Sequence, residues 1–137
     1  MIYLPSITDL KTLLKSMKPK LIDHEFVFCT LPYESLPELK IDPLLIFREQ
    51  EGATIIIEKE SADANSLPYS MTWAQITLTV HSDLEAVGFL AAITARLAKS
   101  GISVNPVSAY HHDHLFVPYE KKDKALKLLE EQSSSWD

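Results

Sequence analysis

In the second half of the chain, a strand pattern leads directly into a long apolar helix pattern, and this order restricts the possible folds. WAQITLTV at 73–80 is rich in β-branched residues, which are typical of strands. Ser82–Glu85 fits the S-x-x-E capping box that opens many helices. We expect this helix to end at Ser100-Gly101, because glycine accepts the left-handed conformation found after helices. ISVNPVS at 102–108 reads as the next strand, so the segment predicts a β-α-β unit.

The remaining segments continue this alternation of strands and helices. In the predicted helices, apolar residues recur at helical spacing. In the predicted strands, they cluster in short runs bounded by turn residues. The further predicted elements are a helix at 6–17 capped by Ser6, a strand at 23–31, a hairpin at 44–60 that turns at Glu51-Gly52, a short helix or loop at 61–70, a strand at 114–118 and a helix at 121–132.

The order of these elements predicts an α+β protein with two related modules, at 1–70 and 71–133. A β-α-β unit combined with an antiparallel hairpin indicates a ferredoxin-like βαββαβ module, in which helices cover one face of an antiparallel sheet. The second module has no strand after its final helix. We expect a strand from the first half of the chain, or from a partner chain, to fill that place.

Composition excludes several classes of protein. The net charge is −6 and the basic residues are scattered, which argues against a nucleic-acid partner. No apolar run approaches the roughly 20 residues that cross a bilayer. The chain opens without a basic segment and long apolar core, and its single cysteine, Cys29, has no internal disulfide partner. These features favour a cytoplasmic protein without a membrane span.

Catalytic motifs are also missing from the sequence. A nucleophile, a base and an oxyanion site would all be required for covalent catalysis. Cys29 and His24 lie on one predicted strand, on opposite faces and roughly 17 Å apart. With three glycines in the chain and no phosphate-binding glycine pattern, we expect neither an enzyme nor a bound cofactor.

The sequence HHDH at 111–114 permits three interpretations: a polar turn between strands, a turn that contacts a ligand or an interface, or a metal site. Alternation along a strand places His112 and His114 on the same side. Stable zinc sites need three or four ligands, so His111, His112 and His114 are weak metal candidates that His24, His81 or Asp113 would have to complete. No CxxC or HExxH motif supports them, and we predict no metal.

The segment 81–118 resembles a known family, the ACT domain, which is a small-molecule sensing module attached to aspartokinase and other amino-acid enzymes. The shared pattern is a strand, a turn, a glycine followed by apolar residues, a helix, and a strand that opens I-x-V. The whole chain resembles short bacterial proteins made of two ACT-like modules without a catalytic domain. The resemblance implies amino-acid binding at the first strand–helix turn, often across an interface between two ACT modules.

The implied ligand site lies around the turn 81–88. Its predicted residues are Ser82, Asp83, Leu84, Ala86, Val87 and Gly88, with Val104 and Asn105 facing the ligand from a neighbouring module. The start of a helix also attracts carboxylates through its free N–H groups and positive dipole end, an argument that does not depend on the family. ACT domains often place the glycine at the tip of the turn, whereas Gly88 lies one turn inside the helix predicted from the capping box.

We therefore expect a regulatory module that binds an amino acid or a related carboxylate, as a homodimer. One alternative is a protein-interaction module that uses an open sheet edge and the apolar face of helix 84–98. The other is a metal-binding protein that uses the histidines of the 111–114 segment.

Overall fold

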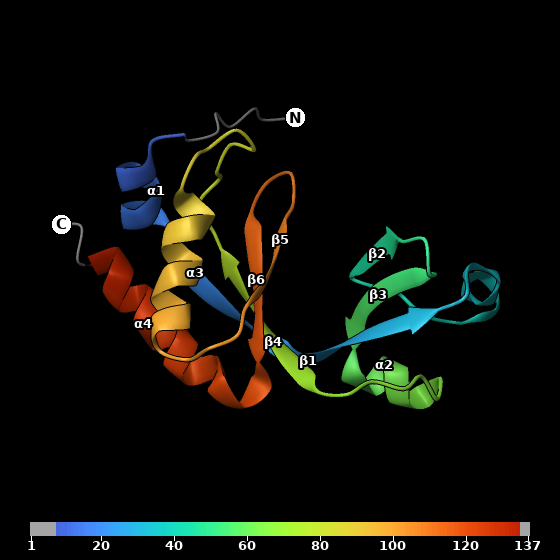
Figure 1. The fold of residues 1–137 in the computed structure, drawn as a ribbon. Coiled ribbons are helices and arrows are strands. Elements are labelled where there is room, and N and C mark those ends of the chain that lie inside the picture. The colour runs from blue at the N-terminus through green and yellow to red at the C-terminus, as the bar shows by residue number, and fades with distance from the viewer. Residues whose placement is uncertain (1–7, 135–137) are drawn as a thin grey trace. The chain divides into compact units, whose positions relative to one another are not determined.

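The computed structural model describes residues 8–134, so the predicted helix cap at Ser6 lies outside the described residues. The chain forms two compact units (Figure 1). The larger contains the chain up to Ile22 together with the chain from Ala74, and the smaller contains Asp23–Trp73. The predicted module boundaries, 1–70 and 71–133, stay a prediction.

The larger unit is a sheet with helices on one face, as the ferredoxin-like prediction requires (Figure 1). Its strands are ordered β1-β4-β6-β5, and the β5–β6 pair is antiparallel. Its elements are α1 (Leu10–Ser16), the first residues of β1 (Pro19–Leu31), β4 (Thr72–Leu78), α3 (Phe89–Lys99), β5 (Asn105–Ser108), β6 (Asp113–Pro118), the short 3-10 helix η2 (Tyr119–Lys121) and α4 (Lys122–Ser134).

The strand that the second module lacks comes from the first half of the chain. β1 lies beside β4 in the strand order. Just before β1, the carbonyl oxygen of Met17 accepts a hydrogen bond of 2.8 Å from the backbone N–H of Thr79. The N-terminal segment therefore completes the sheet of the larger unit.

The core of the larger unit lies between the sheet and its three helices, α1, α3 and α4. Apolar side chains at helical spacing on α3 meet alternate side chains of β4 and β6. Fully buried members of this core include Leu13, Leu14, Ile76, Leu78, Ile93, Leu97, Leu115 and Leu129. Exposed alanines, Ala91, Ala95 and Ala98, occupy the outer face of α3. The apolar helix pattern thus packs in the usual one-sided way.

The smaller unit is built on the predicted hairpin. Its strands are ordered β2-β3-β1 and pair antiparallel, with β2 (Leu45–Arg48) at the edge. Glu49 and Gly52 exchange backbone hydrogen bonds of 2.9 and 3.3 Å, which confirms the hairpin and places its two-residue loop at Gln50-Glu51, one position before the predicted Glu51-Gly52. The other elements are β3 (Ala53–Glu58), α2 (Lys59–Ala64) and the 3-10 helix η1 (Tyr33–Glu38).

The smaller unit has its own core, which contains Cys29 at 4% exposure. Burial raises the pKa of this thiol above its usual value. A thiol in this environment stays protonated and packs as a small apolar group, in agreement with the buried strand position that the sequence predicts.

Two helix starts differ from the prediction. The first helix begins at Leu10, where the Asp9 carboxylate accepts from the Thr12 N–H at 2.9 Å and acts as the cap. The helix predicted to open at Ser82 begins only at Phe89, with Gly88 as its N-cap. The capping-box prediction was therefore wrong: the Ser82 hydroxyl donates to Asp113 and lies outside the helix, instead of accepting from a backbone N–H of its first turn.

The helices are short. α3 has 11 residues and α4 has 13. Across residues 8–134, no helix has the length and apolar character that crossing a bilayer takes.

The core assignment is tested by truncating Leu97, which has no exposed surface. Leu97→Ala should lower the free energy of unfolding by about 2–5 kcal/mol, since it leaves a cavity between α3 and the sheet. Leu84→Ala is the matched control, because Leu84 is 64% exposed; its effect should stay within about 0.5 kcal/mol. Urea unfolding followed by circular dichroism measures both, and equal losses would contradict the assignment.

Candidate functional site

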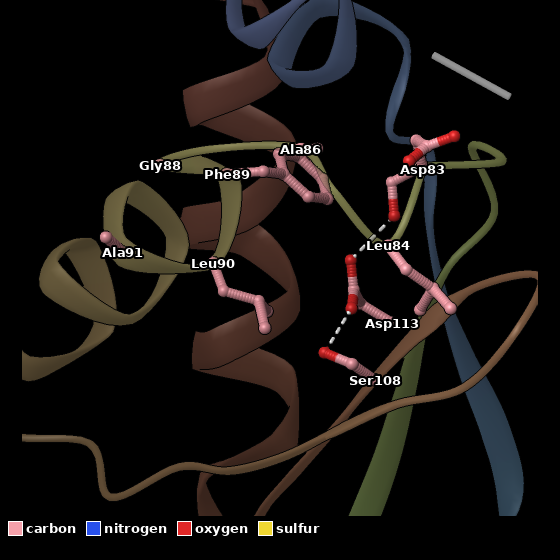
Figure 2. A pocket seen from close by; sticks show the side chains of 10 residues that line it. Asp83, Leu84, Ala86, Gly88, Phe89, Leu90, Ala91, Ser108 and Asp113 are labelled. Carbon is pink, nitrogen blue, oxygen red and sulfur yellow. Dashed lines mark hydrogen bonds between the residues drawn. The ribbon is translucent and has the colours of Figure 1, made fainter. Parts of the chain in front are cut away.

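A cavity of about 170 Å³ opens in the larger unit where β4 leads into α3 (Figure 2). Three segments surround it: the loop 82–88, the first turn of α3, and the end of the β5–β6 hairpin where Ser108 pairs with Asp113. The lining residues are Ser82, Asp83, Leu84, Ala86, Gly88, Phe89, Leu90, Ala91, Ser108 and Asp113.

Asp113 joins the loop to the hairpin. Its carboxylate is 6% exposed and accepts two hydrogen bonds, from the Ser82 hydroxyl at 2.9 Å and the Ser108 hydroxyl at 2.7 Å (Figure 2). The sequence prediction omitted Ser108 and treated Asp113 as part of a turn. The one signal that could have found Ser108 is hairpin register, which places it opposite Asp113 on the neighbouring strand.

Two hydrogen bonds to Asp83 hold the loop 82–88 in a turn. The side-chain carboxylate of Asp83 accepts from the Glu85 N–H at 2.8 Å, and the backbone carbonyl oxygen of Asp83 accepts from the Ala86 N–H at 3.0 Å. The first of these bonds is the side-chain-to-backbone bond of an Asx turn. Leu84 is consequently 64% exposed and Val87 83% exposed.

Gly88 sets the start of α3. Its φ of +87° lies in the left-handed region, where side chains with a Cβ are strained. The carbonyl oxygen of Gly88 accepts from the Ala92 N–H at 3.0 Å, and no side chain caps the helix at this position. The first turn of α3 therefore lines the cavity, and this turn is the positive end of the helix dipole.

The structure gathers part of the predicted ligand set around this cavity. Ser82, Asp83, Leu84, Ala86 and Gly88 line it. Val87 does not line it, and neither do Val104 and the exposed Asn105. A ligand contact at any of these residues stays a prediction.

The histidines lie beside one another near the cavity. The ring centroids of His81 and His111 are 5.4 Å apart, those of His81 and His112 6.5 Å, and those of His112 and His114 6.3 Å. The described part of the chain contains no group of three or more histidine, cysteine or acidic side chains placed to hold a metal ion. The side chains of His111, His112 and His114 are thus adjacent but not arranged as a ligand set.

His114 faces β4 instead. Its Nδ1 atom lies 2.9 Å from the Thr77 hydroxyl and 3.2 Å from the Gln75 side-chain nitrogen. Burial, and after it the neighbouring His112, lower the pKa of His114 below its usual value. The neutral ring is the form that suits these contacts.

The lowered pKa of His114 predicts a pH-dependent stability. As the pH falls below about 6.5, the unfolded chain takes up a proton before the folded one does, so the free energy of unfolding decreases until the folded-state pKa is reached. His114→Gln should remove this component and flatten the profile. Urea unfolding at about pH 7.5 and about pH 5.5 tests this, with exposed His111→Gln as control. An unchanged pH profile in His114→Gln would refute it.

The left-handed conformation of Gly88 leads to a second prediction, on the stability of its variants. Gly88→Ala should lower the free energy of unfolding by about 1–2 kcal/mol, because it forces a Cβ into the left-handed region. Gly88→Asn should cost less, since asparagine tolerates this conformation better. The nearest atom to an added Cβ, on Leu10, lies at 3.6 Å, so steric contact does not confuse the comparison. Equal stability of all three chains would argue against the left-handed cap.

Comparison with known proteins identifies the family. Two family models, both described as ACT domain, match residues 5–74 and 72–131. No curated protein matches the chain.

Solved structures agree with this fold. A Vibrio cholerae protein of unknown function, described as a possible transport protein, is 43% identical over 90% of this chain and 95% of its own, with a TM-score of 0.80. The ligand-free regulatory subunit of aspartate kinase from Thermus thermophilus is 11% identical over 83% of this chain and 95% of its own, with a TM-score of 0.61. E. coli aspartokinase III in complex with aspartate and ADP is 13% identical over 83% of this chain and 32% of its own, also with a TM-score of 0.61.

The aspartokinase likenesses, at such low identity, show the fold alone. The family models cover both halves of the sequence and agree with the α+β, ferredoxin-like architecture of the structure. The chain belongs to the ACT domain family.

Proposed function

We propose that this chain is a regulatory module without catalytic activity, and that it binds an amino acid or a related carboxylate in the cavity between the loop 82–88 and α3. The observation that carries the proposal is the cavity itself, which opens at the strand–helix turn and is bordered by a helix start, at Gly88, that no side chain caps. ACT domains are generally regulatory modules that bind small molecules, and solved relatives include a regulatory subunit of aspartate kinase.

The size of the cavity supports a small metabolite. Its volume of about 170 Å³ falls below the roughly 300–1,000 Å³ of pockets that enclose drug-sized ligands. Its lining combines apolar side chains, such as Phe89 and Leu90, with the polar groups of Ser82 and Asp113. A ligand with a short apolar part and one charged end fits this combination.

A homodimer would add the contacts that one copy lacks. β5 stands at the edge of the sheet, and Asn105 and Pro106 on it are exposed. We therefore propose that Val104 and Asn105 serve a ligand bound to a second copy, which the family resemblance implies. The single, buried Cys29 supports a cytoplasmic location.

The alternative function is a protein-interaction module, and the edge strand of the smaller unit favours it. On and beside β2, Leu44 and Ile46 are each 51% exposed and Phe47 is 63% exposed. An exposed apolar edge strand is a template for pairing with a strand of another protein. This alternative predicts no response to small ligands.

A thermal-shift screen of the twenty amino acids and a set of small carboxylates separates the two functions. A ligand present at about 100 times its dissociation constant adds about 2.7 kcal/mol to stability, which raises the midpoint by several degrees. We expect a selective shift with one chemical class. A flat screen would favour the interaction module.

A matched pair of variants locates the binding. Gly88→Leu places a side chain at the cavity, whereas Gly101→Leu imposes a similar left-handed strain, with φ of +74°, where nothing lies within 4 Å of an added Cβ. Both variants should melt earlier than the wild type. Only Gly88→Leu should lose the ligand-induced shift; a shift retained in Gly88→Leu would place the site elsewhere.

A further inference from the structure

The free edge of the smaller unit is β2, and its backbone is open to pairing (Figure 1). Glu49 and Gly52 exchange backbone hydrogen bonds where the hairpin turns. Bonded and non-bonded pairs alternate along an antiparallel ladder, so Phe47 is the next residue of β2 that bonds to β3. The N–H and C=O groups of Ile46 and Arg48 therefore point away from β3. Because β2 ends the strand order, no strand within residues 8–134 pairs with these groups.

The side chains along this edge are apolar and exposed. Leu44, Ile46 and Phe47 each expose half or more of their surface. Edge strands are commonly protected from pairing by lysine or proline, and β2 contains neither. Its one charged residue, Arg48, lies at the end of the strand and stacks on the Tyr33 ring, with 4.9 Å between the guanidinium carbon and the ring centroid. The apolar part of the edge is therefore left unprotected.

The free edge of the larger unit has the protection that β2 lacks. β5 ends the strand order there, and its exposed residues are Asn105, Pro106 and Ser108. The Ala109 N–H donates to the His112 carbonyl oxygen, and the same alternation places Pro106 among the residues that face outward. Proline has no N–H to donate. The edge at β5 is thus closed to a continuous ladder, whereas the edge at β2 is open.

The smaller unit is also strongly acidic. Asp23–Trp73 contains ten acidic and three basic residues, a formal net charge of −7, whereas the rest of the chain contains nine acidic and ten basic residues, a net charge of +1. Acidic residues flank β2 at both ends, with Asp42 before it and Glu49 and Glu51 after it, and all three are exposed. The edge therefore combines an apolar centre with acidic ends.

We propose that β2 docks an extended segment of a partner protein, which adds a strand to this edge and carries lysine or arginine beside its apolar side chains. The backbone of the segment bonds to the outward groups of Ile46 and Arg48, and its apolar side chains cover Ile46 and Phe47. Its basic side chains pair with the carboxylates at the two ends of β2. A second copy of this chain fits less well, because pairing through β2 would bring two acidic units together. The inference names a partner for the alternative function and does not depend on a small ligand in the cavity.

Two fluorescently labelled peptides test the inference on the unmodified chain. Both alternate valine and threonine; one has a pair of lysines at each end, and the other has a pair of glutamates. Fluorescence polarisation measures their dissociation constants at low and at physiological salt. We expect the lysine peptide to bind at least about tenfold more tightly, with an advantage that shrinks as salt rises, because salt screens exposed charges. Equal affinities, or no binding of either peptide, would overturn the inference and leave the small-ligand site untouched.

Variants of the chain locate the docking. Ile46→Pro removes an outward N–H and keeps the bonds between β2 and β3, since proline is tolerated on edge strands, and it should abolish binding of the lysine peptide. Asp42→Lys combined with Glu51→Lys should weaken binding about tenfold at low salt. Glu120→Lys combined with Glu130→Lys makes the same change in net charge at exposed positions of the larger unit and should leave the affinity unchanged. Retained binding in Ile46→Pro, or equal losses in the two charge variants, would overturn the inference.

Sedimentation of the chain without peptide tests the second copy as the occupant. We expect Ile46→Pro to leave the oligomeric state of the chain unchanged. A dimer that dissociates in Ile46→Pro would assign β2 to a second copy and overturn the inference. Circular dichroism checks that Ile46→Pro folds; if it does not, the peptide pair and the charge variants decide the question.

Discussion

The carboxylate of Asp113 holds the candidate site together through its hydrogen bonds to Ser82 and Ser108. One bond ties the loop after β4 to β6, and the other ties the end of β5 to the same residue. Hydrogen bonds to charged groups each contribute about 1.5–3 kcal/mol, so this pair fixes the loop more firmly than neutral contacts would. The three residues joined in this way all line the cavity.

The loop also shows how a local signal and a distant contact compete. The S-x-x-E sequence at Ser82–Glu85 has the spacing of a capping box, yet its serine bonds to a residue 31 positions away. Gly88 then starts the helix because its left-handed φ of +87° ends the loop. The ACT pattern, which has its glycine in the turn before the helix, agrees with the position of Gly88 better than the capping box, which placed Gly88 inside the helix. The family pattern reflects the folded structure, whereas the spacing of a capping box reflects only neighbouring residues.

Most of the fold could be predicted from the sequence, because it depends on periodicity and turn chemistry. The β-branched and aromatic runs of β1 and β3, the turn residues between β2 and β3, and the apolar spacing of α3 and α4 all predict the observed elements. The site could be predicted only in part. Ser82, Asp83 and Gly88 are neighbours in sequence, whereas Ser108 and Asp113 reach the cavity through strand register. The role of His114 was likewise hidden, because its partners lie on β4, 37 and 39 residues away.

Binding of a small ligand at the strand–helix turn of the larger unit can be located residue by residue. The experiment is backbone amide NMR of the ¹⁵N-labelled chain, titrated with a mixture of the twenty amino acids. We expect the largest shifts on residues 83–91 and on Asp113, which surround the cavity. Shifts confined to the smaller unit, or none in either unit, would contradict it.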